Sequence, residues 1–235
     1  MISMRKIGAL YRKNIKNMLY NPFIIALPVL VLVLAFLFGR LLHDEATYYE
    51  TISTMLMVVG INVLMGGANT MAILIAEERE KNTLGVLVTS TVSVLDFLIS
   101  NILTTATLTV ATNIAIFFVM PIEGLPLAGY AVVTSVGTVA SITLGATLGI
   151  LAKSQSAAST LGTPLMILVM LPAIFTDNFF VDNILYYVFT EQINAAMMEL
   201  IDGEMNWFRI IAMTANFVAF TLIFAMCYRK RGLSV

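Results

Sequence analysis

Six long apolar stretches separated by short polar segments dominate the chain. A membrane-spanning helix needs about 20 mainly apolar residues to cross the hydrocarbon core of a bilayer. Each stretch meets that requirement, and no charged side chain lies well inside any of them. The pattern therefore predicts an all-α membrane protein with six transmembrane helices. Their approximate bounds are 22–42, 51–76, 97–120, 129–152, 159–176 and 207–228.

Residues 1–21 precede the first span and show a different pattern. One helical stripe of apolar residues faces a basic side that carries Arg5, Lys6, Arg12, Lys13 and Lys16. This spacing predicts a cytoplasmic amphipathic helix lying in the membrane interface. The alternative, a basic stop in front of the first span, explains the charges but not the stripe. Residues 22–235 then form the six-span domain. The stripe consists of Ile7, Leu10, Tyr11, Ile15 and Met18.

The segment 177–206 is the only long connection between spans. Its first half is apolar but too short to cross a bilayer. Its second half, "EQINAAMMELIDG", has one apolar face, with Thr190 as a possible N-cap and Gly203 as a C-terminal stop. We expect two short re-entrant helices that dip into the outer leaflet before the last span. Tyr186, Phe189 and Met197 are the candidate residues of an outer gate.

Composition and charge agree with this picture. Charged residues make up 11% of the chain, against roughly 25% in soluble domains, and the mean hydropathy is +0.92. If six helices alternate, eleven of the 13 Lys and Arg residues lie on one side and ten of the 14 acidic residues on the other. Basic residues stay on the cytoplasmic side of a membrane. We therefore expect a multi-pass protein of a bacterial or archaeal cell membrane with both termini in the cytoplasm.

Several function classes lack their residues in this sequence. One cysteine and one histidine exclude a disulfide framework and a His/Cys metal cluster. The spans hold no Asp, Glu, His or Lys, which weakens an ion-driven carrier, although a sodium site built from backbone carbonyls stays open. No G-x-x-x-x-G-K-[ST] occurs, so energy for transport must come from another polypeptide. We expect no catalytic residues, no metal, no cofactor in this chain and no nucleic-acid partner.

Small and polar residues recur inside the spans. Gly137, Ser141, Gly145 and Gly149 follow one another at intervals of four residues, a spacing that lets two helices pack closely. The polar residues must find partners in hydrocarbon, so they either bond between helices or line a pathway. The pathway candidates are Asn62, Asn69, Thr105 and Asn113.

Residues 77–96 form the link between spans two and three, and they begin "EEREKNTLGVLVTSTVS". A charged turn comes first, and a short helix with Leu84 and Leu87 on one face follows it. Ser93 and Asp96 have the spacing of a capping box that starts span three. A solvated charged loop would explain the charges but not the exposed leucines. We expect a partly apolar helix at the cytoplasmic edge, available to a partner protein.

This stretch resembles the E-R-E-K-G-T-L-x-x-L-x-x-T-P-V-S motif of ABC type-2 exporter permeases, the membrane subunits that work with separate ATPases. It departs from the motif at Asn82 and Thr91, where Gly and Pro are usual. The interfacial helix, six spans and re-entrant outer helices are similar in layout as well. The matching residues are Glu78, Arg79, Glu80, Lys81, Thr83, Leu84, Leu87, Val92 and Ser93.

The resemblance implies that residues 82–90 form a coupling helix seated in a notch of the ATPase. Two soluble ATPase subunits, which hold ATP and magnesium, would work with two permeases, expected as a homodimer. Lys153 and Gln155, between spans four and five, would make a second, smaller contact. The ATPase-docking set is Glu78, Arg79, Glu80, Lys81, Thr83, Leu84, Leu87, Lys153 and Gln155.

The spans offer Met, Phe, Leu, Thr and Asn but no fixed charge. An amphipathic or hydrophobic substrate, such as a membrane-active antimicrobial peptide or a lipophilic drug, loses less than an ion on entering such surroundings. We therefore expect export of such a molecule. The alternative function is an ion-coupled carrier or a passive channel-like protein without an ATPase.

Overall fold

The computed structural model of the chain describes residues 3–41, 48–81, 93–174 and 185–231, and these residues are helical apart from short connections. The π-helical turns η1 and η3 continue the helices before them, and η4 is a single 3-10 turn. In chain order the elements are α1 (Met4–Tyr20), α2 (Pro22–Phe36), η1 (Leu37–Leu41), α3 (Tyr48–Ile61), η3 (Asn62–Asn69), α4 (Thr70–Glu80), α6 (Val94–Val119), α7 (Leu127–Leu151), α8 (Gln155–Ile174), η4 (Leu185–Tyr187), α10 (Phe189–Ile201) and α11 (Trp207–Arg231).

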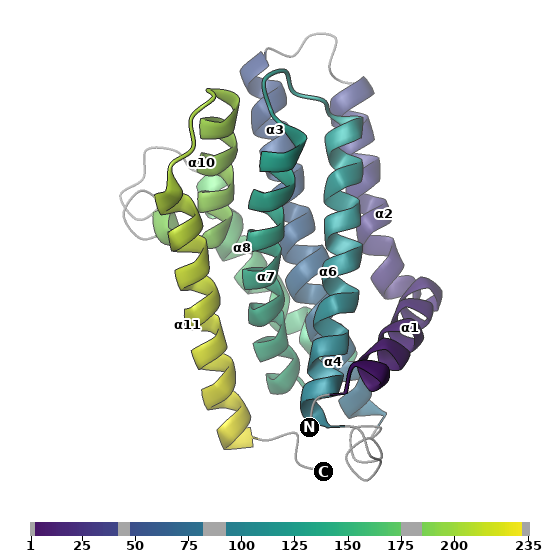
Figure 1. Cartoon of the computed structure of the whole chain (residues 1–235). Helices are drawn as coiled ribbons and strands as arrows, with labels where there is room; N and C mark the ends of the chain where they lie inside the picture. Colours follow the sequence, from purple (N-terminus) through teal and green to yellow (C-terminus); the bar gives the residue numbers. More distant parts are fainter. Residues whose placement is uncertain (1–2, 42–47, 82–92, 175–184, 232–235) are drawn as a thin grey trace.

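The long helices form one bundle, with the start of α1 and the end of α11 at the same end (Figure 1). Within the described residues, four helices are long and apolar enough to cross a membrane, or five if the bent pair of Met4–Tyr20 and Ile24–Gly39 counts as one span. The all-α fold is therefore confirmed, together with four or five of the six expected spans. The fifth expected span corresponds to α8, which is not among them. The four helices are Tyr48–Glu80, Leu95–Val119, Leu127–Leu151 and Trp207–Lys230.

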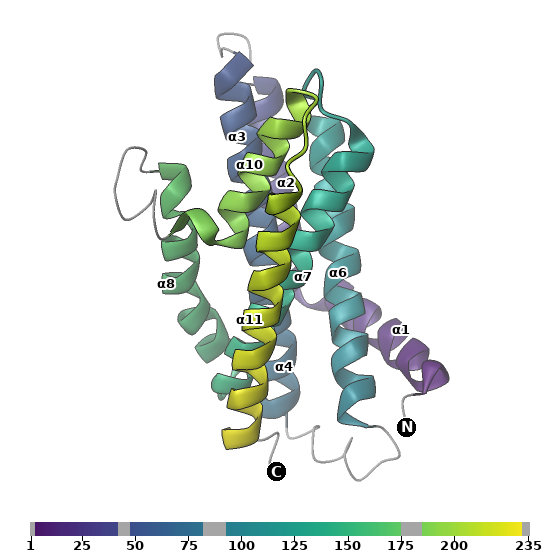
Figure 2. The ribbon, with the colours of Figure 1, turned by 60° about the vertical axis from the view of Figure 1, so that its left-hand side comes forward.

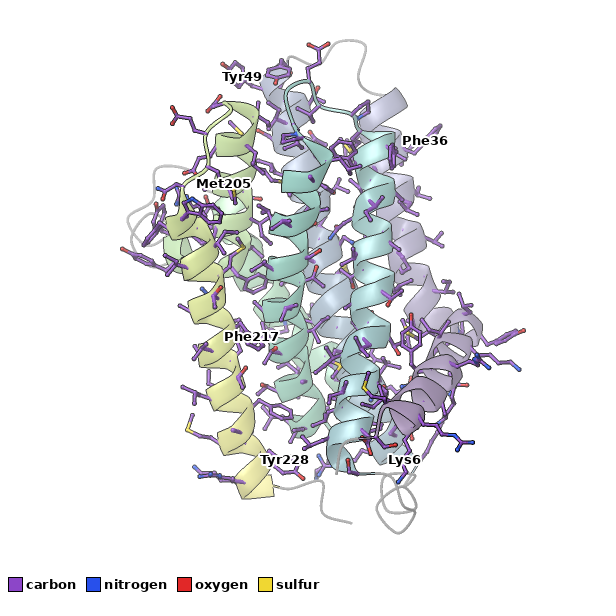
Figure 3. All side chains as sticks on the ribbon, in the orientation of Figure 1. Lys6, Phe36, Tyr49, Met205, Phe217 and Tyr228 are labelled. Atoms are coloured by element: carbon purple, nitrogen blue, oxygen red, sulfur yellow. The ribbon has the colours of Figure 1, made fainter. Side chains whose placement is uncertain are left out.

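The most apolar window of Tyr48–Glu80 is 83% buried, whereas that of Trp207–Lys230 is only 11% buried. Tyr48–Glu80 is therefore the central helix of the bundle, and α11 lies at its edge. Large apolar side chains point outward from the edge helices, as Phe36 does from α2 in Figure 3. Such side chains suit contact with lipid, because lipid chains are as apolar as they are.

The N-terminal helix α1 is a separate element, and its axis differs by 65° from that of the helix after it. Its apolar stripe faces the bundle, since Ile7 and Met18 are buried while Arg12, Lys13 and Lys16 are exposed. The helix is therefore amphipathic, with its apolar face against the bundle; a location in the membrane interface stays a prediction.

The small residues of α7 allow close packing inside this chain. A Cβ atom added to Gly145 would lie 2.1 Å from the carbonyl oxygen of Ala68, and one added to Gly149 would lie 2.7 Å from the Cβ of Ile75. Neither position tolerates a side chain without moving the helices apart. Gly145 and Gly149 therefore join α7 to the central helix, whereas a Cβ atom added to Gly137 would meet Ile193 of α10.

The helix α10 lies inside the bundle rather than on its outer surface. Figure 2 shows it alongside α11, and the ring of Phe189 at its start packs edge-to-face on Phe220, at a centroid distance of 6.0 Å. Phe220 is 13 residues into α11, about 20 Å along its axis at 1.5 Å per residue. Gly203 ends the segment at φ +77°, as predicted. Thr190 was wrong as the N-cap: the cap is Val188, and Thr190 is buried in the first turn.

Candidate functional site

The charged residues Glu77–Lys81 end the central helix, at the end of the bundle where both termini lie (Figure 1). The sequence predicted a charged turn here, and the family resemblance implied that Glu78, Arg79, Glu80 and Lys81 contact a partner ATPase. In the structure most of these side chains bind other helices of the same chain. We call the residues 77–80 and their intramolecular contacts the clamp.

The first half of the clamp holds α1. Lys13 Nζ donates to Glu78 Oε1 at 3.1 Å, and Asn21 Nδ2, between α1 and α2, donates to Glu77 Oε2 at 3.4 Å. The Lys13 side chain is 46% exposed, and exposed ion pairs of this kind contribute only about 0–1 kcal/mol. These contacts therefore set the position of α1 against α4, but they add little to the stability of the fold.

Arg79 binds the end of α7. Its Nη1 donates to the carbonyl oxygens of Ile150 at 2.6 Å and Ala152 at 3.1 Å. The last four carbonyls of a helix have no partner within the helix, and they form the negative end of its dipole. A half-buried guanidinium satisfies both needs at once, so Arg79 is a C-terminal cap supplied by another helix.

Glu80 binds the start of the next helix. Its Oε2 accepts a hydrogen bond from the backbone N–H of Gln155 at 3.0 Å. The first N–H groups of a helix are unpaired and carry partial positive charge, so a carboxylate is favourable there. The positive Arg79 thus holds the negative end of α7, and the negative Glu80 holds the positive start of α8. The turn between these helices is therefore fixed to the end of α4.

Lys81 follows the clamp and pairs with Glu77 one turn earlier. That hydrogen bond raises the pKa of the Lys81 ammonium, and the negative charges of Glu77, Glu78 and Glu80 raise it further. Lys81 therefore keeps its charge throughout the physiological pH range. Thr83, Leu84 and Leu87 lie outside the described residues.

The chain returns at Ser93 with the predicted capping box. Ser93 Oγ accepts from the Asp96 N–H at 3.0 Å, and the Asp96 carboxylate accepts from the Ser93 N–H at 3.3 Å. Asp96 Oδ1 also accepts from the backbone N–H of Ser3 at 2.9 Å. The described chain thus stops at a helix end that the clamp holds, and it resumes at a capped helix that is bonded to the start of α1.

A cavity of about 550 Å³ lies between α4 and α8, beside Glu80. Among the described residues, Ile73, Glu80, Gln155, Ser156 and Ser159 line it.

Residues 5–176 match the ABC-2 type transporter family model. The chain belongs to this family. No curated protein matches it by sequence. The family match confirms the resemblance drawn from the motif, and it spans α1 to α8 with the whole clamp. The chain is thus the membrane-spanning permease of an ABC transporter, a multi-pass transport subunit that is not itself catalytic. Family membership implies an ATPase partner.

The docking residues expected in the permease fall into two groups. Glu78, Arg79 and Glu80 use their charged atoms on other parts of the same chain, as described above. Lys153 is exposed in the turn that Arg79 and Glu80 hold, while Gln155 contributes its backbone N–H to that grip. Contact of any of them with the ATPase stays a prediction.

The pathway candidates lie inside the bundle. Asn62 Nδ2 donates to Asn113 Oδ1 at 2.8 Å, and both residues are buried, with 1% and 0% exposure. Thr105 is fully buried beside the sulfur of Met71, and Asn69 is 8% exposed. The structure therefore brings Asn62 and Asn113 together as an interhelical bond, the alternative that the sequence left open. A pathway role stays a prediction.

The outer-gate candidates belong to η4 and α10. Phe189 and Met197 are fully buried, whereas the Tyr186 hydroxyl accepts from Arg209 Nη1 at 2.5 Å. Arg209 Nε also donates to Glu199 Oε1 at 2.9 Å. This ion pair ties α10 to the start of α11. Sequence reasoning missed it, although Arg209 closely follows the acidic segment 177–206.

Asn14 was missed as well. It lies on α1, and its Nδ2 donates to Asn101 Oδ1 at 2.7 Å, with both side chains buried. The signal in the sequence was a polar residue beside the apolar stripe of an amphipathic helix, next to Ile15. This bond fixes α1 to α6, at the same end of the bundle as the clamp.

Proposed function

We propose that this permease exports an apolar or amphipathic molecule, driven by ATP hydrolysis on two copies of a separate ATPase. The ATPases hold ATP and magnesium and dock on the cytoplasmic segment 77–96, with residues 82–90 as the coupling helix. A second copy of the permease completes the transporter. The excess of basic residues at this end of the bundle supports a cytoplasmic location for the segment and for both termini.

The observation that carries the proposal is the grip of Arg79 and Glu80 on the turn between α7 and α8. A force applied to the segment after Lys81 reaches the end of α4 first. Because Arg79 binds the last carbonyls of α7 and Glu80 the first N–H of α8, the three helix ends move together. Such rigid-body movement of helices is a common basis of alternating states.

Support for the substrate class comes from the interior of the bundle. Its spans carry no fixed charge well inside the bilayer, so a small ion finds no partner there. An amphipathic peptide or lipophilic drug needs none. We further propose six membrane crossings, with α8 as the fifth, and α10 as an outer gate because it packs between α7 and α11 from about mid-depth outward.

The experiment is a double substitution, Leu84→Asp with Leu87→Asp, in the permease expressed with its ATPase. We expect the variant to insert in the membrane normally but to lose stimulation of the ATPase, since charged side chains oppose burial in a docking notch. The matched control is Leu84→Met with Leu87→Met, which keeps the apolar surface and should keep stimulation. Unchanged ATPase stimulation in the Asp variant would refute docking by this segment.

The substrate class has its own experiment. A strain lacking the permease is tested for growth against cationic peptides, lipophilic drugs and salts. We expect greater sensitivity to peptides or drugs, restored by the wild-type gene but not by the Asp variant. Sensitivity to sodium alone would contradict the proposed substrate and favour an ion-coupled carrier.

A further inference from the structure

The central helix contains an unusual segment at its middle. Residues Asn62–Asn69 form a π-helical stretch of eight residues between α3 and α4. π-helical turns are rare and often occur at functional positions. Here the segment separates the outer half of the helix from the half that ends in the clamp.

Three buried polar atoms gather where this segment meets α6. Asn62 Nδ2 donates to the Thr109 carbonyl at 3.0 Å and to Asn113 Oδ1 at 2.8 Å. Asn62 Oδ1, Thr109 Oγ1 and Asn113 Nδ2 have no hydrogen-bond partner among the described residues. All three side chains are at most 1% exposed, and a buried polar atom without a partner is strongly unfavourable.

Thr109 differs from neighbouring threonines of α6. Thr104, Thr107 and Thr112 each donate a hydroxyl hydrogen bond to the carbonyl four residues earlier, at 2.7–2.9 Å. Thr109 makes no such bond, and its hydroxyl lies toward Gly66 instead. A Cβ atom at Gly66 would lie 3.2 Å from Thr109 Oγ1 and 2.9 Å from Asn62 Oδ1. Any side chain at position 66 would therefore press on both oxygen atoms, and glycine lets Asn62 Oδ1 and Thr109 Oγ1 lie beside the same point of the helix.

We propose that this cluster is a binding site for one buried water molecule, held by Asn62, Thr109 and Asn113. The water accepts a hydrogen bond from Asn113 Nδ2, donates to Asn62 Oδ1, and completes its bonding with the Thr109 hydroxyl. Buried waters make about three such bonds to groups that otherwise lack a partner. A metal cation fits less well, because the Asn113 amide presents its N–H to the site and none of the three side chains carries a negative charge.

The bound water makes the π-helical segment a point at which the central helix can bend. Its hydrogen bonds can be exchanged as the cytoplasmic half of the central helix changes angle, so no polar group is stranded in the apolar interior. This consequence rests on the proposed function, in which the clamp moves that half. The site itself does not, and its tests need no transport.

Thermal unfolding of the purified permease tells whether the water is present, because the midpoint of Thr109→Val changes in a different direction in each case. With the water present, Thr109→Val removes one of its partners and lowers the unfolding midpoint, by roughly 3 °C or more. Without it, the substitution replaces an unsatisfied hydroxyl by a methyl group and leaves the midpoint equal or higher. Thr109→Ser should keep the wild-type midpoint. Thr104→Val, equally buried on the same helix, removes a hydroxyl that donates to the Ser100 carbonyl, so its midpoint gives the reference for losing one such hydrogen bond.

A cryo-EM map of the wild-type permease in lipid nanodiscs, at a resolution that shows ordered water, gives the direct test. We expect density within hydrogen-bonding distance of the three atoms, and the same density with choline in place of sodium. Density that requires sodium would identify a cation site and overturn the proposal. So would an empty site in a map that shows other buried waters, or a Thr109→Val midpoint at or above that of the wild type.

Discussion

Replacing Arg79 by Ala should detach the turn between α7 and α8 from the end of the central helix. The substitution removes both hydrogen bonds to the terminal carbonyls of α7. Hydrogen bonds that involve a charged group contribute roughly 1.5–3 kcal/mol, and a cation at a partly buried helix C-terminus contributes up to about 2 kcal/mol. These ranges describe the same contact, so we take about 2 kcal/mol as its strength.

A loss of about 2 kcal/mol raises the population of the detached turn roughly 30-fold, since each 1.4 kcal/mol is a factor of ten. The measurement is the distance distribution between spin labels at positions 81 and 153, both exposed in the wild type. The single native cysteine is first replaced by Cys227→Ser. We expect one narrow distribution in this background, a broad one after Arg79→Ala, and an intermediate one after Arg79→Lys, because an ammonium lacks the reach and shape of the guanidinium.

Lys13→Ala serves as the control, because it removes a clamp contact at an exposed position that contributes only about 0–1 kcal/mol. In the reconstituted transporter, Arg79→Ala should still bind the ATPase but move much less substrate per ATP hydrolysed. A narrow distance distribution together with full transport in Arg79→Ala would refute the clamp as the connection between docking and the bundle.

Three further predictions concern helix packing, helix capping and the ion pair between α10 and α11. Gly145→Ala should lower the midpoint of thermal unfolding, because the new methyl group meets backbone atoms and overpacking costs about 1–3 kcal/mol; Gly60→Ala, where nothing lies within 4 Å, should not. Ser93→Ala should destabilise the permease by about 1 kcal/mol in denaturant unfolding, and an unchanged midpoint would show that the capping box is dispensable. Arg209→Gln and Glu199→Gln should show a coupling of about 1 kcal/mol in a double-mutant cycle, and strictly additive effects would contradict their pairing.

The sequence was sufficient for features that depend on local patterns. The stripe from Ile7 to Met18 predicted the packed face of α1, because helical period alone places those residues together. Ser93 and Asp96 predicted the start of α6, since a capping box needs only residues three apart. Gly145 predicted close packing because no other residue lets helix backbones approach as closely.

Features that depend on distant residues were not predictable in this way. Arg79 meets carbonyl groups 71 and 73 residues later, and every residue offers such a carbonyl, so no side chain marks the partner. The π-helical segment Asn62–Asn69 exchanges hydrogen bonds with Thr109 and Asn113 of α6 and Ser141 of α7, partners that are 47 to 78 residues away along the chain. The depth of α10 follows from packing of Phe189 against Phe220 on α11, whereas the apolar pattern predicted only short helices that dip into the outer leaflet.

The most direct test of the central claim is purification of the tagged permease from its own membranes under mild conditions, followed by reconstitution in liposomes. We predict that a soluble ATPase with a phosphate-binding loop purifies with it in equal amount, and that Leu84→Asp with Leu87→Asp abolishes this association. Substrate should then move only when ATP is present. A permease that purifies alone and moves the same substrate down an ion gradient without ATP would contradict the account.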